Sequence, residues 1–422
     1  MLRGLSAAVL GGCVVLGLLL SSGCVPELSL LGLGGDSIVA GAQETAEPST
    51  PASEPSLADA TSPSSDGAST FTPASLPLST SVSGTVSGTG SYQRFEFGPG
   101  APGDTWRVTA NTPPLSASFV VVLLDERDEL LYRRVLGSQD TLEHILRYAA
   151  GRVSVGIMPL AGSSGGSFDL RISRVVGSVP PPRPERVYLN FAGGSGVRVQ
   201  NRAALSFPAF DAASLGSAYV GLTDEIKRGI VATVRADYAP YDVIIMTSDE
   251  GPLPSGSVAV LHFGGNDPRL LGLAAGVDLY NSQPGGVAVI YTDSFAPFAA
   301  MRLEPAEFAS MIGNTASHEL GHLLGLFHTR QPDDVMDTTG SAWDLVGEQT
   351  LGTAPLEPTV FAVGSQNAPA ILAAAVGLSP TFEPPGKSAP VAKGSQALDP
   401  RRKIIIDIAS RCGTCLELEE GE

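Results

Sequence analysis

The chain has 422 residues, of which 43% are hydrophobic, so it contains enough apolar material for a substantial core and for two or three domains. This composition excludes a chain that is disordered throughout. The 26 basic and 43 acidic side chains give a formal charge of −17, which argues against electrostatic binding of nucleic acid phosphates or anionic lipid headgroups.

Residues 1–24 are predicted to be an export signal. Arg3 precedes an apolar run from Leu5 to Leu20, and small residues from Ser21 lead to Cys24. The pattern resembles a bacterial lipoprotein signal, which implies that Cys24 carries a lipid that anchors the exported protein at the cell envelope. Ordinary cleavage with free secretion is a second interpretation. An uncleaved anchor is a third, although the apolar run is short for a membrane span.

Residues 25–82 are predicted to form a disordered stalk. From residue 40 onward Ser, Thr, Pro and Ala dominate, as in Thr45 to Pro51, and large apolar side chains are scarce. Such a segment buries too little surface to offset the entropy of the chain. We expect it to hold the folded part away from a membrane surface.

Residues 83–178 are predicted to form an all-β sandwich. Short alternating or apolar runs, such as Tyr92 to Phe97 and Ser118 to Leu124, are separated by turn residues. Roughly six or seven such strands favour two packed sheets. The runs Ala150 to Val155 and Gly166 to Arg171 are similar to bacterial pre-peptidase C-terminal domains, which accompany secreted proteases.

Residues 185–380 are predicted to form an α/β (α+β) domain, after a proline-rich boundary at 180–184. Strands are expected at Arg186–Phe191, Asp242–Thr247, Val258–Phe263 and Gly286–Thr292, with helices at Thr223–Tyr238, from about Pro305 onward, and at Asn367–Leu378. Thr223 and Asn367 are the expected helix caps. In the helix that begins near Pro305, an apolar stripe of Phe308, Met311, Ile312 and Thr315 should face the core. The segment Thr338 to Asp344 should form a wall of a cleft.

The most specific motif lies in this domain, where three of the five histidines of the chain fall within residues 318–328. His318 and His322 are four residues apart, so on a helix their imidazoles can converge on one cation. Gly325 allows the chain to leave the helix through a left-handed turn that brings His328 to the same point. Three protein ligands leave a zinc ion one open position, and Glu319 is placed to act as general base on a zinc-bound water.

The pattern H-E-x-x-H-x-x-G-x-x-H resembles the metzincin zinc metallopeptidases, and Met336 in Asp334 to Asp337 fits the methionine turn that this family has beneath the metal. The short connection from His328 to Met336 is similar to that of the matrixin branch. No tyrosine follows Tyr291, so the tyrosine ligand of astacin-like and serralysin-like members is not expected.

This resemblance implies a twisted mixed sheet above the cleft, one catalytic Zn²⁺, and an exported zinc endopeptidase that acts on a protein or peptide. The substrate is expected to pair with an edge strand, for which Gly286 to Thr292 is the candidate. Two alternatives stay open: a non-catalytic surface lipoprotein that uses a protease-like fold for adhesion, and a hydrolase of nonpeptide amides. The sequence does not establish calcium sites or the oligomeric state.

The remaining histidines and cysteines are expected to play no part in the reaction. His144 is predicted to lie on the surface, and His262 to be a buried or rim residue at a strand end. Residues 381–422 form a C-terminal tail in which Cys412 and Cys415 are expected to form a local disulfide. The alternative is that one of these thiolates reaches the zinc and keeps the enzyme latent.

Overall fold

The structure is a computed structural model that describes residues 79–88, 90–111, 117–137 and 140–382. The signal with Cys24, the stalk, and the tail with Cys412 and Cys415 lie outside the described residues. Within the described residues, no helix combines the length and apolar character needed to cross a membrane.

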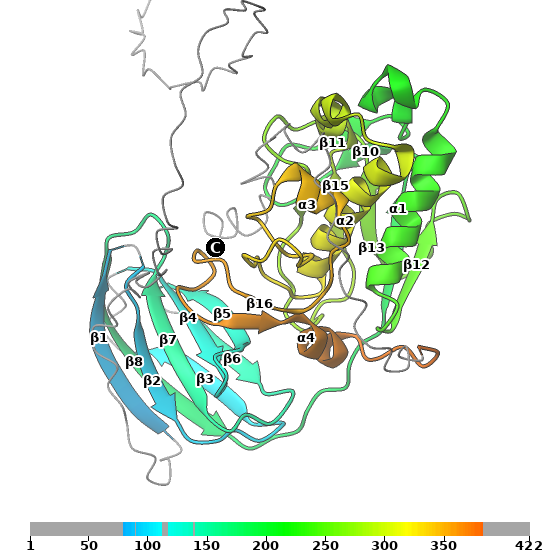
Figure 1. Cartoon of the computed structure of the whole chain (residues 1–422). Helices are drawn as coiled ribbons and strands as arrows, with labels where there is room; N and C mark the ends of the chain where they lie inside the picture. The colour runs from blue at the N-terminus through cyan, green and yellow to red at the C-terminus, as the bar shows by residue number, and fades with distance from the viewer. Residues whose placement is uncertain (1–78, 89, 112–116, 138–139, 383–422) are drawn as a thin grey trace, which may run out of the picture. The chain divides into compact units, whose positions relative to one another are not determined.

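The N-terminal half of the described chain contains two four-stranded antiparallel sheets (Figure 1). One sheet has the order β1 (Ser79–Ser87), β8 (Gly165–Val175), β3 (Thr105–Ala110), β6 (Thr141–Ile145). The other has the order β2 (Gln93–Phe97), β7 (Val153–Pro159), β4 (Phe119–Leu124), β5 (Leu130–Leu136). Side chains of both sheets, among them Trp106 and Phe119, share one hydrophobic core. The strands expected from short apolar runs are therefore present, and they begin at residue 79.

Strand β4 is buried along its whole length, which explains why it reads as an apolar run and not as an alternation. Val121 and Leu123 point into the core shared by the two sheets. Val120 and Val122 belong to a second cluster that includes Phe361. A strand covered on both faces has no solvent side on which a polar residue would be favoured.

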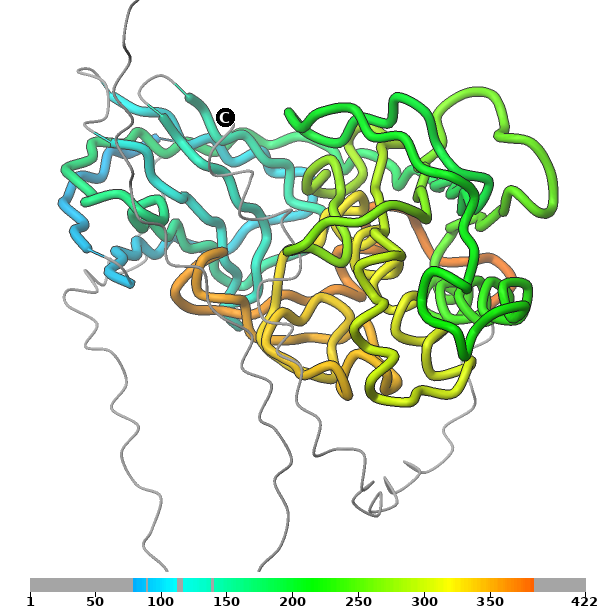
Figure 2. The backbone as a smooth tube through the Cα atoms, turned by 90° about the horizontal axis from the view of Figure 1, so that it is seen from above, coloured from blue at the N-terminus to red at the C-terminus, as the bar shows by residue number. Residues whose placement is uncertain are grey.

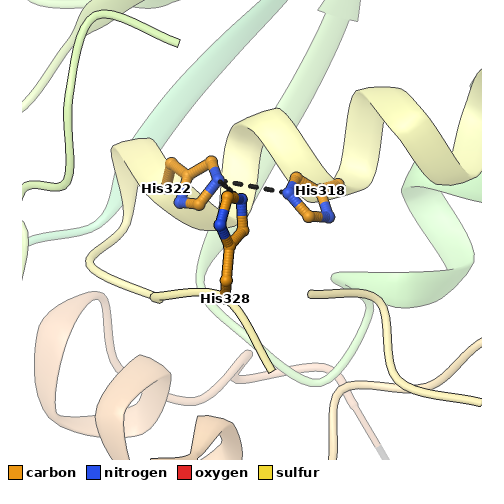
Figure 3. A group of neighbouring side chains, drawn as sticks. All are labelled: His318, His322 and His328. Carbon is orange, nitrogen blue, oxygen red and sulfur yellow. Dashed lines mark hydrogen bonds between the residues drawn. The ribbon is translucent and has the colours of Figure 1, made fainter. Parts of the chain in front are cut away.

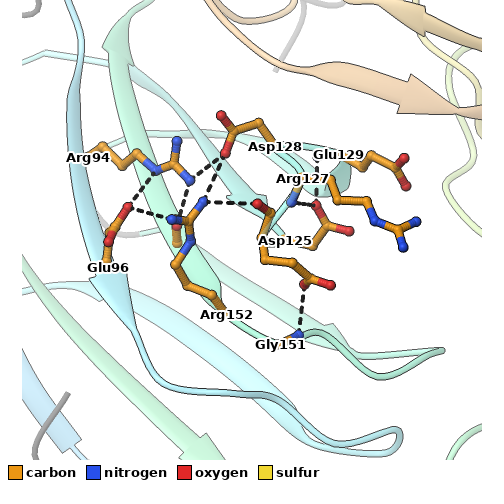
Figure 4. A network of polar contacts seen from close by, with 10 residues as sticks. Arg94, Glu96, Asp125, Arg127, Asp128, Glu129, Gly151 and Arg152 are labelled. Atoms are coloured by element: carbon orange, nitrogen blue, oxygen red, sulfur yellow. Dashed lines mark hydrogen bonds and ion pairs between the residues drawn. The ribbon is translucent and has the colours of Figure 1, made fainter.

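A polar network joins β2, β7 and the turn between β4 and β5 (Figure 4). The Arg94 guanidinium lies 2.5 Å from Asp128 Oδ1. Arg152, just before β7, contacts Glu96 Oε1 at 3.0 Å and Asp128 Oδ1 at 3.1 Å. Two cations thus neutralise two carboxylates, so this network joins the strands as a structural contact.

The C-terminal half is mixed α/β. Its main sheet has the order β12 (Val243–Thr247), β9 (Glu185–Asn190), β13 (Ala259–Phe263), β15 (Gly286–Ile290), β14 (Gly272–Ala274). The first four strands are parallel, and β14 runs antiparallel to β15. The long helices α1 (Thr223–Asp237) and α2 (Pro305–Leu323) pack side by side (Figures 1 and 2), and α2 also contacts β13, β14 and β15.

Shorter elements complete this half: β10 (Gly194–Val197), β11 (Leu205–Phe207), α3 (Ala342–Val346), β16 (Thr353–Pro355), β17 (Ser365–Asn367), α4 (Ala368–Ala375) and three 3₁₀ helices at Ala212–Leu215, Ser217–Tyr219 and Thr292–Met301. Asn367 caps α4 as predicted, because its side chain accepts a hydrogen bond from the Ala370 amide. Thr223 is not the cap of α1: the capping position is Leu222, and the Thr223 hydroxyl donates to Asp211 at 2.9 Å.

Two further expectations are wrong. The strand β15 is paired on both sides, by β13 and β14, so the edge strand at this end of the sheet is β14. His144 is buried, with its ring stacked between Tyr132 at 4.7 Å and Tyr280 at 5.1 Å between centroids. Burial lowers the pKa of His144 to about 3, so this ring stays neutral.

Candidate metal centre

Helix α2 carries two of the candidate ligands, and its start follows the predicted signals. Pro305 occupies the first turn, and Glu304 and Glu307 form a reciprocal capping box, in which the Glu304 amide donates to the Glu307 carboxylate at 2.7 Å. From Phe308 to Leu323 every residue except Ser310 is buried. The helix is therefore held from all sides, and packing fixes the positions of the side chains that it presents.

The three histidines of the motif converge in the structure (Figure 3). His322 Nε2 lies 3.1 Å from His318 Nε2 and 3.2 Å from His328 Nε2. The ligand atoms of the three rings all lie within 4.8 Å of one another. In a search of the His, Cys, Asp and Glu side chains of the described residues, these three form the group that could hold a metal ion.

Hydrogen bonds at the opposite ring nitrogens fix the protonation of two of these rings. His318 Nδ1 lies 2.8 Å from the Val335 carbonyl oxygen, and His322 Nδ1 lies 2.8 Å from the Leu326 carbonyl oxygen. A carbonyl oxygen only accepts, so both Nδ1 atoms donate, and in the neutral rings both Nε2 atoms carry lone pairs. Two facing lone pairs cannot bond to each other, whereas a cation between them satisfies both.

Burial lowers the pKa of all three imidazoles. The pKa of His318 falls to about 4. The rings are therefore neutral near pH 7, which is the form that binds a metal. Three neutral, buried nitrogen donors fit a zinc ion that keeps one further position open.

Gly325 turns the chain so that His328 completes the group. Its φ of +103° is a left-handed conformation that glycine adopts without strain, and a Cβ there would lie 2.8 Å from Leu279 Cα. The Leu326 amide then donates to the Gly321 carbonyl at 2.8 Å and closes the end of α2. Both the conformation and the close approach exclude a larger residue at position 325.

Met336 lies directly beneath the ligand-bearing turn of α2. The residue is fully buried, and a Cβ on Gly321 would lie 2.4 Å from Met336 Sδ. The absence of a side chain at position 321, between the two helical histidines, is therefore what allows the methionine to approach. The resemblance drew attention to Met336 but gave no signal for Gly321.

The buried carboxylate of Asp334 holds this methionine turn in place through hydrogen bonds. The sequence analysis did not single it out. Asp334 Oδ1 accepts hydrogen bonds from Thr329 Oγ1 at 2.8 Å and from the Met336 amide at 3.0 Å. Asp334 Oδ2 accepts from the Gly352 amide at 3.3 Å. Burial raises the pKa of Asp334, and these donors counteract the shift. Since Thr329 follows His328 directly, the carboxylate couples the third histidine to the turn.

Glu319 is fully buried beside the edge strand β14. A Cβ on Gly272 of that strand would lie 2.5 Å from Glu319 Oε1, so the carboxylate occupies space that any other residue at 272 would fill. Nothing in the sequence pattern distinguishes Gly272 from the other glycines of the chain, because its role arises from contact between distant segments.

A small pocket of about 50 Å³ opens beside Glu319 and His318. The remaining lining residues are mostly apolar or hydroxyl-bearing: Leu271, Gly272, Thr315, Val335, Asp337, Thr338, Leu345 and Gln349. Thr338 thus belongs to the wall that was predicted at 338–344. His262 lies outside the histidine group, half-buried, with its Nδ1 2.9 Å from the Asn190 side-chain amide.

Comparisons with known proteins give structural likeness only. No protein-family model matches the chain, and no curated protein matches its sequence. A zinc-dependent peptidase from Methanocorpusculum labreanum is 12% identical, with 39% of this chain and 93% of that chain covered and a TM-score of 0.25. Archaemetzincin from Methanopyrus kandleri is 15% identical, with 40% and 87% covered and a TM-score of 0.23.

The pre-peptidase C-terminal domain of a collagenase from Bacillus anthracis is 12% identical, with 23% of this chain and 90% of that domain covered and a TM-score of 0.17. TM-scores this low carry no argument about function.

Proposed function

We propose that the protein is a zinc-dependent endopeptidase. The observation that carries the proposal is the convergence of three buried, neutral imidazoles, with the ring orientation of His318 and His322 set by backbone carbonyls. A buried glutamate and a pocket adjoin the same point. A metal site used only for structure would need a fourth protein ligand, and the described His, Cys, Asp and Glu side chains supply three.

In this proposal His318, His322 and His328 hold the zinc ion. Bound zinc supplies a Lewis acid that polarises a water and the scissile carbonyl. Glu319 accepts the proton of the attacking water and passes it to the leaving amine. Its burial keeps bulk solvent from competing for that proton.

The substrate is proposed to lie extended along β14. This strand is one of the two edge strands of the sheet, and its Gly272 lies against the Glu319 carboxylate and lines the pocket. Pairing at the Gly272 end of β14 would position a peptide bond near the histidine group while one side chain enters the pocket. At the other end of the strand, the Ala274 carbonyl already accepts a hydrogen bond from Gln200 Nε2 at 2.9 Å. The edge that the topology provides is thus also the edge nearest the proposed chemistry.

Several wider assignments belong to the same proposal. We propose that residues 185–380 have a metzincin-type architecture, on the support of the zinc motif and of the buried Met336. We propose residues 83–178 as an accessory sandwich of the pre-peptidase C-terminal kind. Export with a lipid anchor at Cys24 is supported by the leader sequence alone.

The decisive experiment measures zinc content and peptide cleavage together for Glu319→Gln. We expect the variant to hold one zinc per chain and to lose roughly 10²–10⁴-fold in cleavage rate, the range for removal of a general base. Glu225→Gln, on the exposed surface of α1, is the matched control and should behave as wild type.

Three outcomes contradict the proposal at different points. If zinc-loaded Glu319→Gln cleaves peptides at the wild-type rate, Glu319 is not the general base. If wild-type protein contains no stoichiometric zinc, the three histidines are not a zinc site. Zinc-loaded wild-type protein that cuts no member of a broad peptide library leaves the non-catalytic adhesion alternative in place.

A further inference from the structure

Two hollows of different chemistry lie on either side of Gln349. The first is the pocket of about 50 Å³ beside His318 and Glu319. The second is larger, about 410 Å³, and lies between α1, α2 and the segment after α3. Among the described residues Gln349 is the one that lines both. Its side chain is therefore the partition between them.

Gln349 is a buried amide with an unused acceptor. Its side chain is 7% exposed, and Nε2 donates to the Pro332 carbonyl at 3.3 Å. Oε1 is buried without a hydrogen-bond partner within the described part of the chain. A buried, half-satisfied amide costs stability, so packing alone does not explain a glutamine at this position.

The segment that carries Gln349 is held in place by α2. Asn314 Nδ2 donates to the Leu345 carbonyl at 2.8 Å and to the Gly347 carbonyl at 2.9 Å. Since Gly347 lies two residues before Gln349, these bonds fix the backbone from which the partition projects. The partition is therefore a defined wall, anchored to the helix that bears the histidines.

The pocket beside His318 and Glu319 has room for a short aliphatic side chain. A cavity needs about 10–15 Å³ of the same measure for each water-sized group, so about 50 Å³ holds roughly three to five heavy atoms. That number corresponds to valine or leucine. The walls contributed by Leu271, Val335 and Leu345 match such a side chain in polarity.

The second hollow differs from the pocket in its charge. Asp237 and Glu348 both line it, and their charges interact. Burial raises the pKa of Asp237 to about 6, so at pH 8 this carboxylate is ionised. The described residues that line the hollow include no Lys or Arg. An ammonium or guanidinium group would therefore be favoured there.

We propose that Gln349 determines specificity by separating the pocket beside the metal centre from the acidic hollow. The native protein then prefers a short aliphatic side chain next to the scissile bond, and removal of the Gln349 side chain joins the pocket to the acidic hollow and admits a long basic one. This inference rests on the proposed peptidase function for its substrate, but the shape of the pocket can be tested without turnover.

The test compares two zinc-binding probes by calorimetry at pH 8 on zinc-loaded protein. 4-Methylpentanohydroxamic acid carries a short branched chain, and 6-aminohexanohydroxamic acid carries a long chain that ends in an ammonium group. We expect wild type to favour the first probe, and Gln349→Ala to shift the affinity ratio toward the second by about tenfold or more. Glu348→Gln in the Gln349→Ala background should reverse part of this shift.

Gln331→Ala, at an exposed position, is the control and should leave the ratio unchanged. If Gln349→Ala does not fold by circular dichroism, Gln349→Asn removes one methylene and should give a smaller shift in the same direction. An unchanged ratio in a folded, zinc-loaded Gln349 variant overturns the inference.

Cleavage of peptides that differ only in Leu or Lys beside the scissile bond then separates the two proposals. If wild type cuts neither peptide while the probe ratio shifts, the pocket is as inferred and the peptidase function is wrong. If wild type cuts the Leu peptide and the variant shows no gain on the Lys peptide relative to Leu, the inference about substrate choice is wrong and the peptidase function stands.

Discussion

Gly272→Ala is expected to disable the proposed general base without touching a metal ligand. The added Cβ would lie 2.5 Å from Glu319 Oε1, whereas ordinary van der Waals contact begins at 3.4 Å, so the carboxylate must move by about 3.4 − 2.5 = 0.9 Å. Misplacement of a catalytic group by about 1 Å can cost on the order of 100-fold in rate, or about 2.7 kcal/mol in activation free energy.

The assay is steady-state cleavage of a peptide, with zinc content measured on the same samples. We expect kcat to fall by about 100-fold with one zinc still bound per chain. Gly251→Ala is the matched control, because a Cβ there meets nothing within 4 Å, and it should keep the wild-type rate.

A second background shows whether the effect is steric. Glu319→Asp retracts the carboxylate by one methylene, so adding Gly272→Ala to it should cost much less than the same change in wild type. An equal cost in both backgrounds, or an undiminished rate in Gly272→Ala alone, would refute the reasoning from contact.

Three further predictions concern the surroundings of the site. Gly325→Ala should weaken zinc binding by roughly ten- to a hundredfold in a competition titration. The reason is that a positive φ costs a non-glycine residue about 1–3 kcal/mol, and this turn places His328 beside the other two histidines. A zinc affinity equal to that of wild type would contradict this prediction. Asp334→Ala should lower the free energy of unfolding by about 2–3 kcal/mol in a denaturant titration, because the buried Met336 amide, the half-buried Gly352 amide and the Thr329 hydroxyl lose their acceptor. Asp334→Asn should lower it by less, and equal losses in the two variants would count against the hydrogen bonds. His144 has a pKa of about 3 in the folded state against 6.5 in the unfolded state, so its contribution to the free energy of unfolding is complete above pH 6.5 and falls by about 1.4 kcal/mol per pH unit as the pH falls toward 3. Between pH 7.5 and pH 4.5, the free energy of unfolding of zinc-loaded His144→Phe should therefore fall by less than that of wild type. Identical decreases in the two proteins would exclude His144 as the source.

The parts of the fold that sequence predicted well are those set by local periodicity. The start of α2 follows from a proline and two glutamates within one turn, and the convergence of His318 and His322 follows from helical spacing. Gly325 could be singled out because a turn directly after a helix requires a residue that tolerates positive φ. Each of these signals lies within a few residues of the feature that it predicts.

The errors arise where segments distant in sequence meet. The edge strand β14 has three residues, Gly-Leu-Ala, and such a segment shows no period from which a strand could be predicted. His144 lies in a strand with alternating burial, and the sequence does not reveal that Tyr280 covers its ring. The roles of Gly272, Asp334 and Gln349 likewise depend on contacts between segments, which hydrophobic patterns do not specify.

The burial of α2 from Met311 to Leu323 has a consequence for how the protein would acquire its metal. Small zinc modules fold only when the ion arrives, because they lack another source of cohesion. Here the apolar interior holds α2, and backbone carbonyls orient the rings of His318 and His322, so we expect folding and metal uptake to be separate events. A chelator should therefore abolish cleavage while the protein stays folded, and later addition of zinc should restore cleavage without a refolding step.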